Sequence, residues 1–295
     1  MNILLLYYSG TFNTSFLVKK VKEEFCGEGH IVDVIDVSKN DGNIDIDKYD
    51  LVGLSYPIYG FNVPNKLLRF VRSINFKRQQ KYFIFKNSGE TLSLNNASSR
   101  KIIRYMKRKK TNFLGEYHFV FPYNIHFEFP KQFIKSIINE DKKILKIMMH
   151  NLKNDIFHCY KSNIFITINA FFFSIQRWGG PINSFFYKVD KNKCVNCGKC
   201  IDECPNDNIY QKNDKIMFHH KCNMCMRCSF YCPADAIDIG FLNGWKVHNY
   251  YNLDYYWNLA LDERDYVHNM SDKFYNNIIT HFKNIDFEYK KIFKQ

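Results

Sequence analysis

Short apolar runs alternate with longer amphipathic stretches over the first half of the chain. The runs are typical of strands buried on both faces, and the stretches between them carry apolar residues at helical spacing. The five predicted strands are Ile3–Tyr8, Ile31–Val37, Leu51–Tyr56, Tyr82–Lys86 and Tyr117–Phe121. The predicted helices lie near Thr14–Phe25, Pro64–Ser73, Asn95–Lys109 and Phe133–Leu152. This alternation predicts an α/β fold with a doubly wound, five-stranded parallel sheet.

Parallel sheets of this kind bind ligands beyond the carboxyl ends of their strands. The first such end reads Ser9-Gly10-Thr11-Phe12-Asn13-Thr14 and combines hydroxyl groups with a turn that opens a helix. Backbone N–H groups and the positive end of the helix dipole make such a turn an anion site. The loop has no Lys and matches neither the triphosphate nor the dinucleotide glycine pattern. It therefore favours a single phosphate monoester, such as that of FMN.

Eight of the ten cysteines form two runs of identical spacing, each followed by a proline. The second run begins 28 residues after the first, so the region is an internal repeat. Three thiolates at two-residue gaps suit three irons of a [4Fe-4S] cubane, and a fourth thiolate from the other run suits the last iron. Structural zinc, the alternative, uses two separated pairs of ligands and gives the third cysteine of each run no role.

Interlocking of this kind distributes the cysteines between two clusters. Cluster one would use Cys194, Cys197, Cys200 and Cys232. Cluster two would use Cys222, Cys225, Cys228 and Cys204. On this motif the segment of about residues 187–240 resembles bacterial two-cluster ferredoxins, which have a small α+β fold.

The loop Ser9–Thr14 also carries a resemblance. Flavodoxins commonly read Ser-Gly-Thr-Gly-Asn-Thr there, so residues 1–155 resemble a flavodoxin-like FMN-binding domain. The resemblance implies two further FMN loops after the third and fourth strands. They are Pro57, Ile58, Tyr59, Gly60 and Phe61, and Asn87, Ser88, Gly89 and Glu90. Phe12 replaces the second Gly, which lets backbone approach phosphate freely, so we expect Phe12 to strain the loop or weaken FMN binding.

The whole chain resembles the flavodoxin–ferredoxin fusion proteins, or ferrodoxins, of anaerobic bacteria. That resemblance implies electron transfer between two [4Fe-4S] clusters and FMN within one chain, without catalytic residues of its own. Two alternatives remain: a flavin-dependent reductase of a small molecule fed by its own ferredoxin domain, and a redox-sensing or partner-binding module. We expect a helical connector at 156–186. We expect the aromatic-rich extension at 241–295 to lie across the ferredoxin segment.

Charge and apolar runs bear on partners and location. Lys and Arg number 42 against 29 Asp and Glu, a formal net charge of +13 that suits nucleic acid, an anionic membrane or an acidic protein. No nucleic-acid-binding module is recognisable, which favours a redox protein such as an acidic ferredoxin or oxidoreductase. The run Lys107–Lys110 is either a solvated helix end or a docking site for that partner.

The start of the chain lacks the cationic, cleavable pattern of a signal peptide, so a cytoplasmic location is expected. The longest apolar stretch, Ile164–Ile175, is shorter than the ~18 residues of a membrane span. We interpret it as a helix in the core between the domains. A segment lying on a membrane surface is the alternative.

Overall fold

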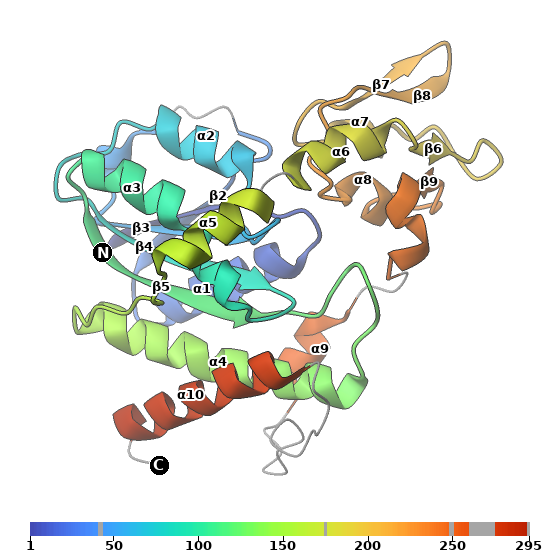
Figure 1. Ribbon diagram of the computed structural model, residues 1–295. Coiled ribbons are helices and arrows are strands. Elements are labelled where there is room, and N and C mark those ends of the chain that lie inside the picture. The colour runs from blue at the N-terminus through green and yellow to red at the C-terminus, as the bar shows by residue number, and fades with distance from the viewer. Residues whose placement is uncertain (41–43, 174–175, 248–250, 260–274, 294–295) are drawn as a thin grey trace.

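The computed structural model describes residues 1–40, 44–173, 176–247, 251–259 and 275–293. A sheet flanked by helices occupies one side of the molecule, and the small cysteine region, residues 187–240, lies beside it (Figure 1).

The sheet has five parallel strands in the order β2-β1-β3-β4-β5, as in flavodoxin-like folds. The strands are β1 (Asn2–Tyr7), β2 (Ile31–Asp36), β3 (Leu51–Pro57), β4 (Lys81–Ser88) and β5 (Asn112–Val120). The central residues of β1, Ile3–Leu6, are fully buried on both faces, because helices cover each side. The predicted fold class and all five strands are therefore confirmed.

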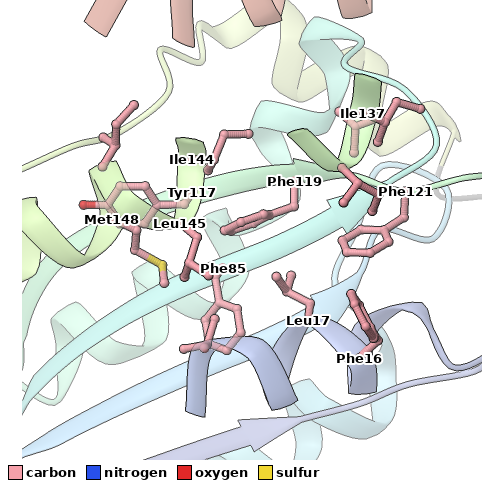
Figure 2. Packing of buried hydrophobic residues seen from close by; sticks show 14 of the residues in the cluster. Phe16, Leu17, Phe85, Tyr117, Phe119, Phe121, Ile137, Ile144, Leu145 and Met148 are labelled. Atoms are coloured by element: carbon pink, nitrogen blue, oxygen red, sulfur yellow. The ribbon is translucent and has the colours of Figure 1, made fainter. Parts of the chain in front are cut away.

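Successive residues of a strand point to opposite faces, and each face has its own core. Ile3 and Leu5 pack with α1 (Asn13–Gly27) and α4 (Lys131–Lys153), whereas Leu4 and Leu6 face α2 and α3. Of these, α2 spans Asn65–Ser73 and α3 spans Arg100–Arg108. Aromatic side chains of β5 interleave with aliphatic side chains of α4 in the first core (Figure 2).

The helix predicted at Asn95–Lys109 begins later than expected. Residues Ser93–Ala97 form a 3-10 turn, η2, and α3 follows it. The Asn95 side chain donates hydrogen bonds back to Ser88 Oγ (3.3 Å) and to the carbonyl of Glu90 (2.8 Å). These bonds hold the turn against the end of β4, so the α-helix starts only beyond it.

Two helices of the C-terminal extension pack on the sheet domain, so for them the expected position across the ferredoxin segment was wrong. Leu242, near the start of the extension, does pack against the core of the cysteine region. Helix α10 (Asn276–Phe293) lies along α4, and α9 (Leu253–Asn258) also contacts α4 (Figure 1). Apolar residues of α10, among them Phe282, join the same core as β5. The apolar spacing of α10 matches the outer face of α4, and burial of that face explains the arrangement.

The connector also differs from expectation. It contains α5 (Ile164–Phe173) and α6 (Gln176–Ser184), but most side chains of α5 are exposed rather than buried. Ala170 is the buried residue of α5. Residues 174–175 of the predicted apolar stretch lie outside the described residues. None of the helices in the described part of the chain combines the length and apolarity that crossing a bilayer requires.

The internal repeat is visible in the cysteine region. Helix α7 (Lys199–Asp202) holds the third cysteine of the first run, and α8 (Arg227–Phe230) holds that of the second. The strands pair in two antiparallel sets, β6 with β9 and β7 with β8. They are β6 (Lys188–Val189), β7 (Ile209–Lys212), β8 (Lys215–Phe218) and β9 (Ile237–Asp238), and the 3-10 turn η3 (Gly240–Trp245) follows.

A buried ion pair joins β4 to β5 beneath the third predicted FMN loop. Lys86 Nζ lies 2.8 Å from Glu116 Oε2, with the two side chains 0% and 1% exposed. The ammonium also donates to the carbonyl of Asn95 (3.3 Å) and to Ser99 Oγ (3.2 Å), and Ser99 donates to the same carboxylate. The pair thus links the sheet to the turn that anchors the loop.

We expect Lys86→Met to lower the free energy of unfolding by about 3–5 kcal/mol, because Glu116 is then left buried without a counter-ion. Urea denaturation measures the loss. The matched control is Lys81→Met. Lys81 lies on the same strand as Lys86 but forms an exposed ion pair, with Asp155, so its loss should cost less than about 1 kcal/mol. Equal losses in the two variants would contradict this account of the pair.

Candidate functional site

The carboxyl ends of β1, β3, β4 and β5 surround a cavity of about 460 Å³, which the cysteine region closes on one side. All of the predicted FMN-loop residues except Ser9 and Phe12 line this cavity. The three loops come together because parallel strands place their carboxyl ends at one edge of the sheet.

The first loop is held by its own hydroxyl groups. Thr14, which is buried, donates a hydrogen bond to Asn87 Oδ1 (2.7 Å) and so joins the first loop to the third. The buried Ser9 Oγ accepts from the backbone N–H of Ser15 (3.4 Å) at the start of α1. Thr11 and the backbone of Gly10 remain at the cavity wall, beside the positive end of α1.

The second loop makes a tight reversal at the cavity edge. Tyr59 and Asn62 exchange two backbone hydrogen bonds of 3.0 Å, and Gly60 and Phe61 between them have φ of 51° and 59°. The Asn62 side chain donates to the carbonyl of Gly60 (2.7 Å) and fixes the turn. Left-handed φ at both central positions is the geometry of a type I′ turn.

The third loop is held in place by a histidine side chain of β5. Ser88 Oγ lies 2.8 Å from His118 Nε2, and the pKa of His118 is held well below its usual range, first by burial and then by the Lys86 ammonium. A neutral imidazole therefore supports the loop. The carbonyl of Asn87 accepts from the N–H of Ile58 (2.9 Å), which joins the third loop to the second.

A fourth segment lines the cavity and was absent from the prediction. It comprises Tyr123, Asn124, Ile125 and His126, which follow β5. Asn124 donates to Thr11 Oγ1, and Asn13 Nδ2 donates to the carbonyl of Pro122 (3.0 Å). The same strand-end argument that located the first three loops also applies to β5 and would have found this one.

A carboxyl group sits in the wall of the cavity. Burial raises the pKa of Glu90, and a hydrogen bond from Tyr123 partly opposes that shift. The Tyr123 ring lies over Gly89, where a β-carbon would come within 2.2 Å of it. The cavity thus combines aromatic surfaces with a few polar groups, which is typical of cofactor sites.

The eight motif cysteines surround two smaller cavities in the cysteine region. We call cage one the set Cys194, Cys197, Cys200 and Cys232, which lines the first of them. We call cage two the set Cys204, Cys222, Cys225 and Cys228, which lines the second. Each cage takes three thiols from one run and the fourth from the other, which is the combination predicted from the sequence.

The chemistry of each donor set suits a positively charged inorganic core. Burial, and then the neighbouring Cys225, raises the pKa of Cys222 to about 11. Burial and then Cys232 raise the pKa of Cys200 to about 11 in the same way. Cys200 and Cys222 therefore resist ionisation unless a cation is bound beside them, as iron is in a cubane. Among the described residues, no group of three or more His, Cys, Asp or Glu is arranged to hold a single metal ion.

Cage two adjoins the large cavity. Its loop, Asn223–Met226, lines both the large cavity and, through Cys225, the cage itself. A β-carbon on Gly10 would come within 2.7 Å of the carbonyl of Cys225 and 2.2 Å of Tyr59 Oη. Only a residue without a side chain therefore permits this approach. No cysteine of cage one lines the large cavity.

One buried polar atom beside this contact, Asn223 Nδ2, lacks a protein partner among the described residues. The Tyr8 hydroxyl hydrogen-bonds the thiol of Cys225, and the pKa of Tyr8 is raised well above its usual range, first by burial and then by that cysteine. A polar ligand in the cavity could accept the unused hydrogen bond of Asn223.

Ion pairs hold the cysteine region against the sheet domain. Arg227, 4% exposed, bonds Asp36 at the end of β2 (2.9 Å) and lies 3.3 Å from Glu203. Lys39 completes the group with a 2.6 Å contact to Glu203. Arg227 and Asp36 are 191 positions apart, and Lys39 and Glu203 are 164 apart, so no local sequence pattern indicated these pairs.

Phe12 contributes to the same interface. Its ring stacks on Tyr231 of the cysteine region, with centroids 4.6 Å apart and planes at 13°. Its φ is +23°, in the region that favours glycine, as expected from the residue it replaces. A strained backbone at this loop therefore coincides with an aromatic contact between the two parts of the molecule.

Comparison with known proteins supports the assignment of the cysteine region. The model of the 4Fe-4S binding domain family matches residues 187–210. An uncharacterized ferredoxin of Methanocaldococcus jannaschii is 35% identical over 54 residues, which span 17% of this chain and 70% of that protein. A ferredoxin of Methanothermococcus thermolithotrophicus is 35% identical over 55 residues, which span 17% of this chain and 92% of that protein.

Solved structures similar to the first half include two flavodoxins. One, from Streptococcus pneumonia TIGR4, has a TM-score of 0.36 at 16% identity and covers 50% of this chain and 96% of its own. The other, Flavodoxin 1 from Bacillus cereus, has a TM-score of 0.39 at 14% identity and covers 52% and 98%. The chain therefore belongs to the ferredoxin family, and the strand order of its first half is that of a flavodoxin-like fold.

Proposed function

We propose that this protein transfers electrons between two [4Fe-4S] clusters and FMN, all held by one chain. One observation carries the proposal. The cage-two loop, Asn223–Met226, lines the same cavity as the three strand-end loops, so a cluster and a flavin would be immediate neighbours. Joining them in one chain removes the diffusional encounter between two separate carriers.

Cages one and two would hold the clusters. The support is that each cavity is lined by four thiols drawn from both runs, the ligand count of a cubane. The backbone N–H groups of Asn208, Met224 and Ala236 lie 3.2–3.3 Å from sulfur atoms of Cys204, Cys222 and Cys232. Hydrogen bonds of this kind stabilise thiolates and tune cluster potentials.

The large cavity would hold FMN. The first loop, at the start of α1, offers backbone N–H groups and the Thr11 hydroxyl for a phosphate. The second loop and the segment after β5 offer Tyr59 and Tyr123 as aromatic walls, and Asn223 Nδ2 offers an unused donor. Bound FMN would supply an acceptor for one or two electrons, whereas each cluster passes one at a time.

We infer an order for the route. No cysteine of cage one lines the large cavity, and Cys197 of that cage is exposed, so an external redox protein would exchange electrons there. Cage two adjoins the cavity and would pass electrons between cage one and FMN. We expect the partner to be another redox protein and the chain to serve as a carrier.

The first test is the cofactor content of the chain purified without oxygen. We expect about eight irons, about eight acid-labile sulfides and about one FMN per chain, measured by colorimetric assay and by fluorescence of the released flavin. Photochemical reduction of the clusters should then bleach the flavin. Flavin that stays oxidised would refute the proposed route, and rapid reoxidation by a small molecule rather than by redox proteins would favour a reductase.

Gly10→Ala tests the contact between cage two and the cavity. The new β-carbon would collide with the carbonyl of Cys225, so we expect unchanged iron content but slower reduction of the flavin by the clusters. Stopped-flow absorbance measures the rate. The control is Gly27→Ala at the end of α1, where a β-carbon meets nothing within 4 Å. If the two variants transfer electrons at the same rate, the contact is not part of the route.

Phe12→Gly, compared with Phe12→Ala, distinguishes the effect of the strained backbone at position 12 from the effect of the ring stack on Tyr231. Relief of the strained φ, worth about 1–2 kcal/mol, should tighten FMN binding several-fold in a fluorescence titration. Phe12→Ala is the matched control, because it also removes the stack on Tyr231 but keeps the β-carbon that causes the strain. Equal FMN affinity in the Gly and Ala variants would show that the backbone of this loop does not limit binding.

A further inference from the structure

Helix α5 exposes an apolar stripe that no other described part of the chain covers. Phe165, Phe171 and Phe172 are 72%, 69% and 61% exposed, and Ile164 and Ile168 are 61% and 45% exposed. These five residues follow the i, i+1, i+4, i+7, i+8 spacing of one helix face. A surface helix normally turns such a face inward, whereas α5 turns it toward solvent.

The surroundings of this stripe carry one sign of charge. The segment 156–189 that contains α5 has three Lys or Arg and no Asp or Glu. The segment 91–115, which contains η2 and α3, has seven Lys or Arg and again no Asp or Glu. Together the two segments supply cations and apolar groups without a single acidic side chain.

The two segments are in contact. Helix α5 packs on η2, and Asn96 Nδ2 donates to the carbonyl of Lys161 (3.1 Å). Arg100, at the start of α3, donates to the carbonyl of Asn163 (3.5 Å), just before α5. These contacts hold the start of the basic helix α3 beside the start of the apolar helix α5.

The length of α5 limits how it can meet a lipid. Ten residues span about 15 Å, half of the ~30 Å hydrocarbon thickness, so the helix cannot cross. An apolar stripe with basic neighbours is instead the pattern of a helix that lies in the plane of a bilayer surface. Phenylalanine side chains enter the acyl boundary, and Lys and Arg pair with anionic headgroups.

We propose that α5 attaches this protein to the surface of an anionic lipid bilayer, with the basic side chains of α3 on the headgroups. An acidic protein partner would match the charge but would not require three neighbouring, outward-facing Phe side chains. The attachment also reaches the cofactor cavity. Phe173 packs edge-on against Phe61 (5.3 Å), and the carbonyl of Ala170 accepts from Asn62 (3.4 Å), so the second loop would sit close to the lipid.

Vesicle co-sedimentation of the anaerobically purified full chain tests the proposal. One set of vesicles is phosphatidylcholine alone, and the other contains phosphatidylglycerol in addition. We expect binding to the anionic set only, reduced by added salt. Phe165→Ser/Phe171→Ser/Phe172→Ser should weaken it roughly tenfold or more, and Arg104→Glu/Lys107→Glu/Lys161→Glu should abolish the preference for anionic lipid.

The matched control is Phe287→Ser, which removes a Phe that is 74% exposed on α10, away from α5. It should bind vesicles as the unmodified chain does, and all variants should keep their iron content. Absence of binding to anionic vesicles, or unchanged binding by the α5 variant, would overturn the proposal. So would a dimer in solution that the α5 substitutions dissociate and that does not bind vesicles.

Discussion

The approach of the Cys225 backbone to Gly10 is the contact on which the arrangement of the whole molecule depends. A β-carbon at position 10 would occupy the space that the Cys225 carbonyl now fills, so the two parts approach this closely only because that side chain is missing. The same glycine belongs to the loop that opens α1. Gly10 therefore belongs both to the wall of the large cavity and to the contact with the cysteine region.

A buried ion pair makes the placement of the cysteine region on the sheet domain specific. Burial alone would lower the pKa of Arg227, but hydrogen bonding to Asp36 and its charge hold that pKa above its usual range. A guanidinium so enclosed is costly unless it is paired. Placing the cysteine region elsewhere would part Arg227 from Asp36 and Glu203 from Lys39, and the loss of these two pairs favours the observed placement.

Two features break local rules, and both lie at surfaces for which we propose a function. Phe12 has a backbone conformation that favours glycine, and its ring reaches across to Tyr231. Helix α5 faces its apolar stripe outward, beside segments that carry only positive charge. Departures of this kind are expected where binding, rather than stability, has shaped the sequence.

Patterns within short stretches of sequence sufficed for the strands, the helices of the sheet domain and the interlocked cysteine sets. The reason is that strand alternation, helical spacing and the two-residue gaps between Cys194, Cys197 and Cys200 each report local geometry. The strand-end rule located three cavity loops and would have located the fourth, after β5. Tertiary structure alone decided that α10 packs on α4, that α5 is exposed and that cage two rather than cage one meets the cavity. Those outcomes depend on contacts between residues far apart in the chain, such as Arg227 with Asp36. The free energy of such a contact cannot be inferred from the residues next to either partner in the sequence.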